Sequence, residues 1–353
     1  MKRCVRCLMP ENFQLLTNIE QKSVKLNEKG ICNFCENDTN FNLKEKHKKE
    51  LKKDLEETFK KCKDSGNVYD CVMGLSGGKD SSYLLYLLVK KYKLIVLAVT
   101  VDNGFLPEVA INNAKRVSKK LNVEHTIIKL NSFEKVIRYA LTHLLPNQLC
   151  RDSLCVKCHN AIFSWLVKIA IDKNIALVIS GETPRQNPFN AFYEIDSHIL
   201  NEEGFIPKEF RNSDILTDKE IKDYYFNPKQ YPNLNNFPRV LFPYHVMGYN
   251  KEEIKKKVFE LGLLSKNRLN HTATNCYLGK FMPYVDLYRT NYYSWINDWS
   301  FKIRKGTLKR TKALLMLKTV RLLIKLGILW RWERNFCLKK IDLTMKEIIN
   351  NKF

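Results

Sequence analysis

Residues 76–82, SGGKDSS, follow an apolar run and open a helix-forming stretch, and their side chains are of types that bind phosphate. Gly77 and Gly78 let the backbone approach a ligand closely, and the exposed N–H groups of a helix N-terminus attract anions. Lys79 adds a cation, while Asp80 could cap the helix or help to place Mg²⁺. The predicted phosphate-contacting residues are Ser76, Gly77, Gly78, Lys79, Asp80, Ser81 and Ser82. The spacing is not GxxxxGK[ST], which excludes a P-loop NTPase.

Two CxxC pairs near the start of the chain predict a metal site. Cys4 and Cys7 form the first pair, and Cys32 and Cys35 form the second, with 24 residues between the pairs. Four thiolates at this spacing are typical of a zinc ribbon, in which they converge tetrahedrally on Zn²⁺. A polar segment of this length is too short to build its own core, so we expect metal to supply folding energy.

A third cysteine-rich stretch, CRDSLCVKCH, ends in Cys155, Cys158 and His159, which we expect in a loop just before a helix. Cys276 lies far downstream in HTATNCYL. A second zinc ion, free thiols near a substrate and a purely structural role all remain open for these cysteines.

The surrounding pattern predicts the elements that position these residues. Apolar runs alternate with amphipathic stretches, and repeated β-α-β units form a parallel sheet with helices on both faces. The fold class is therefore α/β, a doubly wound parallel sheet. The expected strands are 68–75, 94–102, 124–130 and 175–182, and the expected helices are 80–92, 106–121, 132–145 and 160–174. Asp102, Gly181 and Glu182 end two strands at the carboxyl edge, where such sheets bind ligands.

The chain divides into four predicted parts. Residues 1–40 are the four-cysteine ribbon and 41–66 a linking helix. Residues 67–250 form the sheet domain, with a substrate-facing insertion at about 184–245, and 251–353 form a helical region.

The composition is that of a soluble globular protein, with 44% hydrophobic residues and a formal charge of +23. We expect a cytoplasmic protein, because the sequence shows neither a secretory signal nor a transmembrane helix. The charge fits an anionic partner, and it equally fits a lysine-rich compositional habit.

SGGKDS matches S-G-G-x-D-S, and the chain thereby resembles the PP-loop ATP pyrophosphatases, with their adenine nucleotide alpha-hydrolase-like fold. This resemblance implies that ATP adenylates a substrate oxygen while the loop holds the leaving pyrophosphate. A nitrogen or sulfur nucleophile then displaces AMP. It also implies that Lys79, Asp80 and Glu182 are catalytic, that Asp102 and Gly181 bind the nucleotide, and that Mg²⁺ bridges the phosphates.

Several stretches resemble the N-acetyl sugar amidotransferases of bacterial lipopolysaccharide and surface-glycan pathways. These are CVRCLMP…NEKGICNFC, VMGLSGGKDSSYLLYLL, CVKCH, SGETP and, near the end, KIRKGTLKRTKAL. This resemblance implies a nucleotide-sugar substrate whose acetamido oxygen is activated by ATP and replaced by ammonia from a separate glutaminase subunit. Thr183 stands where that family favours Asn.

A sulfur transferase acting on tRNA or on a small-molecule carbonyl is the alternative. In the thiolating branch a comparable CxxC and a later cysteine hold an iron–sulfur cluster, which would place one on Cys155, Cys158 and Cys276.

The basic C-terminal region has three interpretations. Residues 301–340 contain thirteen Lys and Arg and one Glu. A buried helix with a basic outer face, a peripheral membrane helix and an RNA-binding face all fit this pattern. Arg304 and Arg310 are candidate contacts to substrate phosphates, since they lie in the amidotransferase-like motif.

Overall fold

The computed structural model describes residues 2–12, 14–16, 21–36, 45–145, 148–183, 193–211, 214–234, 236–265, 274–292 and 295–350. Part of the predicted linking helix, 41–44, and part of the predicted insertion, including 184–192, lie outside the described residues.

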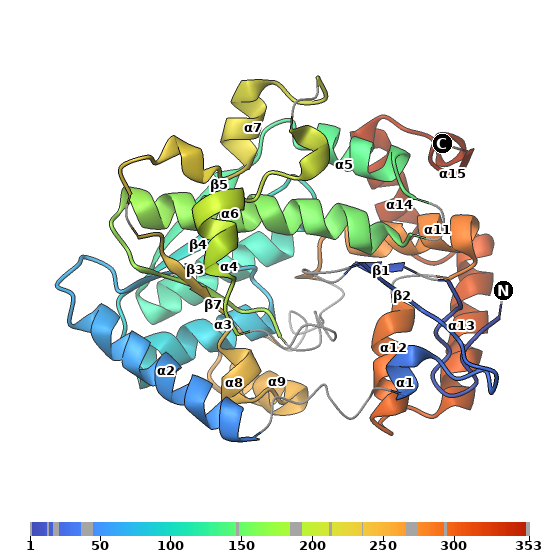
Figure 1. The fold of residues 1–353 in the computed structure, drawn as a ribbon, viewed down its shortest axis with the longest axis horizontal. Helices are drawn as coiled ribbons and strands as arrows, with labels where there is room; N and C mark the ends of the chain where they lie inside the picture. The colour runs from blue at the N-terminus through green and yellow to red at the C-terminus, as the bar shows by residue number, and fades with distance from the viewer. Residues whose placement is uncertain are drawn as a thin grey trace.

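Five strands form one parallel sheet in the order β5-β4-β3-β6-β7 (Figure 1). The strands are β3 (Cys71–Gly74), β4 (Val96–Asp102), β5 (Glu124–Lys129), β6 (Leu177–Ser180) and β7 (Arg239–Leu241). The predicted doubly wound sheet is confirmed. β7 was not predicted, because it has only three residues and lies in the Asn- and Pro-rich insertion.

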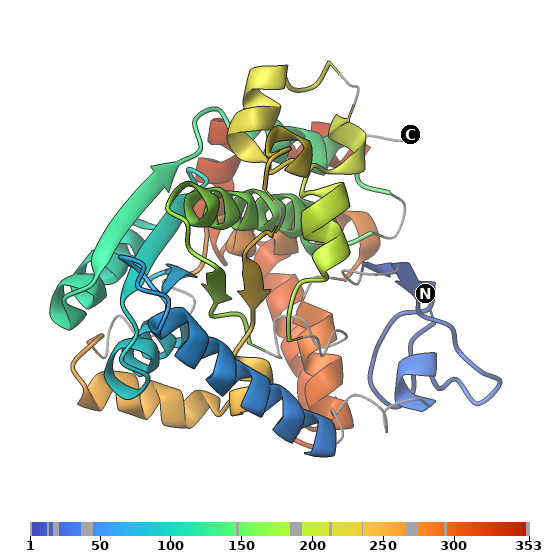
Figure 2. The same cartoon turned by 60° about the vertical axis from the view of Figure 1, so that its left-hand side comes forward.

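Side chains alternate between the two faces of the sheet, and each face has its own hydrophobic core. Val72 of β3 packs into a core with α5 and α6, whereas Cys71 and Met73 pack into a core with α2, α3, α4 and α9. Figure 2 shows α6 and α2 on opposite sides of the strands. These helices are α2 (Glu45–Lys63), α3 (Lys79–Tyr86), α4 (Glu108–Leu121), α5 (Glu134–Thr142), α6 (Val156–Asp172) and α9 (Lys251–Glu260).

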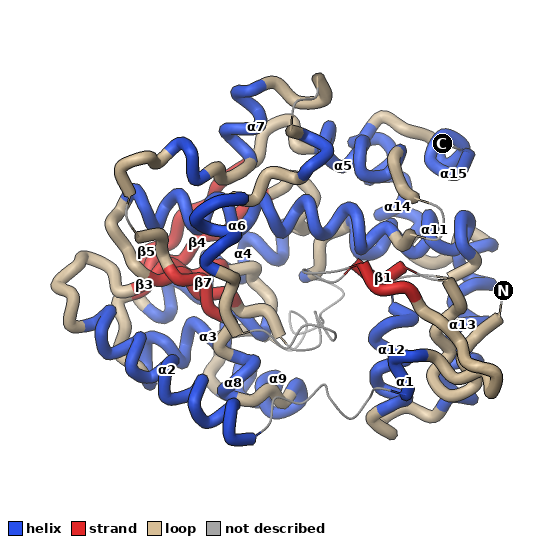
Figure 3. Tube along the Cα trace, in the orientation of Figure 1, coloured by secondary structure: helices blue, strands red, loops and turns tan. Residues whose placement is uncertain are grey.

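The C-terminal region is helical, as predicted, and it joins the N-terminal ribbon (Figure 3). A third core combines Cys4, Cys7, Cys32 and Cys35 with side chains of α11, α12 and α13. Arg3 also lies 4.9 Å from the ring centre of Tyr292. The ribbon elements are β1 (Gln14–Leu16), β2 (Gln21–Ser23) and α1 (Asn33–Glu36), and the C-terminal helices are α11 (Leu278–Thr290), α12 (Trp295–Arg304), α13 (Arg310–Lys325), α14 (Arg331–Ile341) and α15 (Met345–Asn350). The ribbon therefore gains apolar packing from helices almost 300 residues away in sequence.

Shorter elements complete the described chain. They are the π-turns Leu87–Lys91, Arg151–Cys155 and Ile199–Glu203, the 3₁₀ turns Lys208–Phe210 and Pro228–Gln230, and the helices α7 (Asp218–Tyr224) and α8 (Tyr244–Met247). Residues 151–172 are long and apolar enough, by composition, to span a membrane. They pack against β3, β4 and β6, as the core helix of an α/β sheet does.

Candidate active site

The SGGKDS loop connects the end of β3 to α3 and packs against α4. Gly77 has φ +70°, and a Cβ at this position would lie 1.9 Å from the carbonyl oxygen of Ala110. The Asn113 amide donates to the Gly77 carbonyl at 3.1 Å. Only glycine fits here, because α4 packs directly against the loop backbone.

The loop serines have different surroundings. The Ser76 and Ser81 hydroxyls lie 3.0 Å apart. Ser82 is fully buried, and its hydroxyl donates to the Gly78 carbonyl at 2.7 Å. Ser82 thus fixes the shape of the loop, whereas Ser76 is exposed at its rim.

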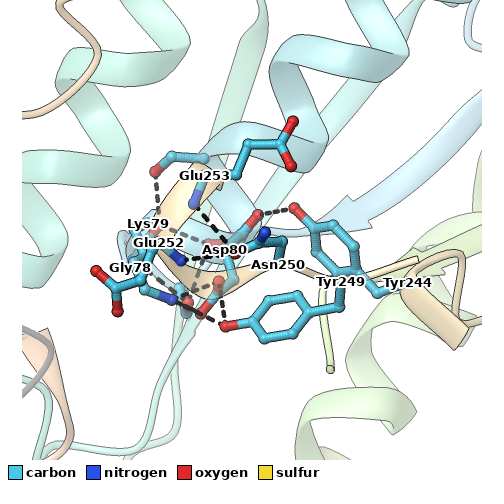
Figure 4. Close-up of polar contacts among 11 residues, drawn as sticks. Gly78, Lys79, Asp80, Tyr244, Tyr249, Asn250, Glu252 and Glu253 are labelled. Carbon is cyan, nitrogen blue, oxygen red and sulfur yellow. Dashed lines mark hydrogen bonds and ion pairs between the residues drawn. The ribbon is translucent and has the colours of Figure 1, made fainter. Parts of the chain in front are cut away.

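Lys79 and Asp80 form an ion pair that the region before α9 supports (Figure 4). The Lys79 ammonium lies 2.5 Å from Asp80 Oδ1 and 3.1 Å from the Tyr249 hydroxyl. Tyr249 also bonds Asp80 Oδ1 at 3.0 Å, and the Tyr244 hydroxyl donates to the Asp80 carbonyl at 2.8 Å. Burial raises the pKa of Tyr244, so this hydroxyl remains a donor. Neither tyrosine was predicted, because both lie more than 160 residues from Asp80 in sequence.

The ends of β4 and β6 lie at the same edge as the loop. Asp102 Oδ1 accepts the Gly104 N–H at 2.8 Å and shapes the turn after β4. A Cβ on Gly181 would lie 3.0 Å from Ser81 Cα, so the end of β6 packs against the start of α3. Glu182 follows, and its carboxylate lies 3.0 Å from His159 Nδ1.

Cys155, Cys158 and His159 lie in helical turns, not in the loop expected before the helix. Cys155 ends the π-turn, while Cys158 and His159 belong to the first turn of α6. The helix begins earlier than predicted because an additional π-turn precedes it. Cys158 and His159 therefore sit at the N-terminal end of α6, and His159 reaches Glu182.

Asn103 brings Cys158 and Cys276 together. Its side-chain oxygen accepts the Phe105 N–H at 3.0 Å, which turns its amide nitrogen toward the thiols. That nitrogen lies 3.6 Å from Cys158 Sγ and 4.0 Å from Cys276 Sγ. Cys155 Sγ lies 4.0 Å from Met282 Sδ. Sequence reasoning missed Asn103, although it directly follows Asp102 at the carboxyl edge.

The segment that carries Cys276 approaches the loop through Thr274. Thr274 Oγ1 is 4.0 Å from the position of a Cβ on Gly78, and Cys276 follows two residues later. Burial raises the pKa of Cys155 to about 11 and that of Cys276 to about 12, so both thiols are protonated at neutral pH.

The N-terminal thiols form a much tighter group. The ligand atoms of Cys4, Cys7, Cys32 and Cys35 all lie within 4.8 Å of one another. Cys4 Sγ is 3.7 Å from Cys35 Sγ, and Cys7 Sγ is 3.5 Å from Cys32 Sγ. Contact with Cys32 and Cys35 lowers the pKa of Cys7 to about 7. Among the residues that the structure describes, no other group of three or more His, Cys, Asp and Glu atoms converges this closely.

Arg304 and Arg310 flank the turn between α12 and α13, in the half of the molecule that carries the ribbon. Both side chains are partly buried. Their predicted role at substrate phosphates stays a prediction.

Residues 70–157 match the family model "Queuosine biosynthesis protein QueC". The chain is 34% identical over 228 residues to a 7-cyano-7-deazaguanine synthase of Clostridium botulinum, a match that covers 60% of this chain and 87% of that protein. The chain belongs to the QueC-type PP-loop ATP pyrophosphatase superfamily. The predicted PP-loop relationship is thereby confirmed, and with it an ATP-utilising enzyme family; the N-acetyl sugar amidotransferase branch is not shown.

Other similarities are partial. A tRNA-specific 2-thiouridylase of Caldanaerobacter subterraneus is 32% identical over 207 residues, 54% of this chain and 51% of that protein. MJ1599 of Methanocaldococcus jannaschii, a protein of uncharacterised function, is 32% identical over 132 residues, 37% of this chain. That match spans less than half, 44%, of MJ1599's own length.

Two solved structures show a weaker similarity. An NMN synthetase of Francisella tularensis is 15% identical, with 84% of this chain and 97% of that chain covered and a TM-score of 0.39. The U34-tRNA thiolase NcsA of Methanococcus maripaludis, solved with its [4Fe-4S] cluster, is 15% identical, with 97% and 89% covered and a TM-score of 0.37. Both TM-scores are below 0.5, so neither superposition bears on the function of this PP-loop protein.

Proposed function

We propose that this PP-loop protein is an ATP-dependent sulfur transferase that replaces a carbonyl-type oxygen of its substrate with sulfur. The observation that carries the proposal is the position of Asn103, directly after β4 at the carboxyl edge of the sheet, whose amide approaches the thiols of both Cys158 and Cys276. Two cysteines more than 100 residues apart in sequence thus contact the same side chain.

The first step forms an adenylate. The substrate oxygen attacks the α-phosphorus of ATP, and the bond to pyrophosphate breaks. The N–H groups of the loop, the Lys79 ammonium and the Ser76 and Ser81 hydroxyls stabilise the charge on the leaving pyrophosphate. Asp80 and Glu182 would hold the Mg²⁺ that neutralises phosphate charge, and the turn shaped by Asp102 would border the nucleotide together with Gly181.

The second step forms a carbon–sulfur bond. A sulfur nucleophile adds to the activated carbon, and the carbon–oxygen bond breaks as AMP leaves with the oxygen. We assign the binding and transfer of this sulfur to Cys155, Cys158 and Cys276. Burial and protonation keep these thiols from reacting until a sulfur donor or metal engages them.

An iron–sulfur cluster fits these three cysteines better than a single metal ion does. Among the described residues the ribbon thiols are the group placed to hold a single metal ion, and these three cysteines are not part of it. In a cluster the thiolates bind different iron atoms and therefore stand farther apart. Such a cluster would supply an iron-bound sulfide or a site for one.

The N-terminal group fits zinc. In a tetrahedral site with Zn–S bonds of about 2.3 Å, neighbouring sulfurs are about 3.8 Å apart. The contacts of 3.7 Å and 3.5 Å between the Cys4–Cys35 and Cys7–Cys32 sulfurs match that spacing. We assign this zinc a structural role, because four thiolates leave no open coordination position.

Amidotransfer is the second candidate. The N-terminal CxxC motifs and KIRKGTLKRTKAL favour it. In that reaction the activated oxygen belongs to an acetamido group of a nucleotide sugar, ammonia from a partner glutaminase is the nucleophile, and Arg304 and Arg310 contact the substrate phosphates.

For sulfur transfer the proposed substrate is a nucleobase of tRNA, which the similarity to a tRNA-specific 2-thiouridylase and the charge of +23 support.

The test is AMP formation by purified protein with ATP, Mg²⁺, and either bulk tRNA plus sulfide or UDP-N-acetylglucosamine plus ammonia. We expect Asp80→Ala to reduce AMP formation at least about 100-fold without unfolding the protein. Full turnover by this variant would remove the loop from the mechanism. Sulfur incorporated into tRNA supports the first candidate, whereas an amidine product supports the second.

A further inference from the structure

The outer face of α13 carries an apolar stripe that the PP-loop chemistry does not use. Of the twelve large apolar side chains exposed among the described residues, five lie between 315 and 332. Leu315, Leu322 and Leu326 are 66%, 58% and 61% exposed. Because a helix turns about 100° per residue, these leucines share one side of α13.

The opposite side of α13 fixes the helix in place. Ala313, Leu317 and Ile324 are buried in the third core, against the ribbon and α12. In Figure 1, α13 lies at the edge of the molecule beside the N-terminal segment. The exposed leucines therefore form a preformed, outward face on an anchored helix.

Lysines border this stripe. At helical spacing, Lys312 lies on one side of the leucines, and Lys318 and Lys325 lie on the other, all three exposed. Residues 299–332 contain ten Lys and Arg and no Asp or Glu. Beyond the helix, exposed Ile328 and Trp332 extend the apolar surface.

We propose that this face docks on the surface of an anionic lipid bilayer. The leucines would enter the boundary between headgroups and acyl chains, while the lysine ammonium groups would reach the phosphates on either side. Each lysine near an anionic surface strengthens binding, and salt weakens that contribution.

The composition of the face argues against three other occupants. RNA binding uses aromatic and arginine side chains that stack on bases, and the centre of this face is leucine. Protein interfaces are depleted in lysine, which borders this stripe throughout. A second copy of the chain would bring two strongly basic faces together.

The experiment is co-sedimentation of the full chain with phosphatidylcholine vesicles, with and without phosphatidylglycerol. We expect binding only to the anionic vesicles. Leu322→Gln/Leu326→Gln and Lys318→Gln/Lys325→Gln should each weaken it at least about tenfold. The matched controls Val68→Gln and Lys49→Gln/Lys52→Gln change equally exposed side chains elsewhere and should bind like wild type.

Thermal unfolding and AMP formation should be unchanged in all four variants, since none of these residues belongs to the PP-loop site. Absence of vesicle binding by folded wild type would overturn the proposal, as would equal binding to neutral vesicles. So would a leucine variant that keeps vesicle binding but loses tRNA binding or self-association.

Discussion

The two halves of this molecule hold cysteines in opposite ways. In the ribbon half, four thiols converge within 4.8 Å, and their mutual contacts lower the pKa of Cys4 and Cys7 and raise that of Cys32 and Cys35. In the sheet half, Cys155, Cys158 and Cys276 each approach a neutral group, Met282 or Asn103, and burial raises their pKa. Convergent thiols are suited to permanent metal binding, whereas separated, protonated thiols beside a nucleotide site are suited to chemistry that begins only when substrate arrives.

The largest effect is expected in the ribbon half. Cys32→Ser should release the bound metal and lower the free energy of unfolding by about 4 kcal/mol or more, since structural metal supplies folding energy. Metal content and urea unfolding measure this. Cys62→Ser, a buried cysteine outside both groups, should cost about 1 kcal/mol and keep the metal. Equal effects of the two variants would contradict a metal site in the ribbon.

Cys276→Ser should impair the reaction and leave stability and zinc content nearly unchanged, the opposite of Cys32→Ser. We expect sulfur transfer to fall at least about 100-fold, while the free energy of unfolding and zinc content change little. Sulfur incorporation into tRNA and AMP formation are measured together. If AMP formation continues and sulfur transfer stops, the cysteine acts after adenylation. Undiminished sulfur transfer would exclude Cys276 from the reaction.

Lowering the pH should destabilise the sheet half of the molecule through His245 of α8. This residue follows Tyr244, whose hydroxyl donates to the Asp80 carbonyl. Burial lowers the pKa of His245 from 6.5 to about 4. The unfolded chain therefore binds a proton at a higher pH than the folded chain, and the free energy of unfolding falls as the pH drops from about 6.5 to 4. We expect a loss of about 2 kcal/mol, allowing for partial exposure.

Unfolding in urea at pH 7 and pH 5, with zinc in excess, checks this expectation. His245→Gln should flatten the pH dependence, and His143→Gln, at an exposed position, should not. Identical slopes for both variants would show that His245 is not the group responsible.

The smallest effect is expected at Asn103, whose side-chain amide contacts the thiols of Cys158 and Cys276. Asn103→Ala should slow sulfur transfer about tenfold, because one or two weak contacts to sulfur are lost. AMP formation should stay within about twofold of wild type, since Asn103 does not contact the loop serines. A parallel fall in both rates would mean that Asn103 supports the whole site instead of the thiols.

Local patterns were enough to predict the PP-loop, the four sheet strands that precede residue 182, and the ribbon cysteines. Each depends on residues close in sequence: a glycine turn between strand and helix, apolar runs, or CxxC spacing. Tyr244, Tyr249 and Asn103 could not be found this way, because their roles arise only when the chain returns to the carboxyl edge of the sheet. The shared core of the ribbon and the C-terminal helices also depends on contacts across almost the whole chain.

The position of Cys155 and Cys158 shows a different limit. The sequence predicted that these cysteines lie next to a helix, but not that they lie within its first turns. The π-turn at Arg151–Cys155 precedes α6, so the helical structure begins before both cysteines. A short, irregular turn has no periodicity to detect. β7 was not predicted for a similar reason, since a strand of three residues is too short to show an alternation of apolar and polar side chains.

The most direct test is metal and sulfide analysis of protein purified without oxygen. We predict about one zinc per chain, together with iron and matching acid-labile sulfide. Cys32→Ser should lose the zinc and keep iron and sulfide, and Cys155→Ser/Cys158→Ser should do the reverse. Zinc alone, with no iron or sulfide before or after reconstitution, would contradict sulfur transfer and favour amidotransfer.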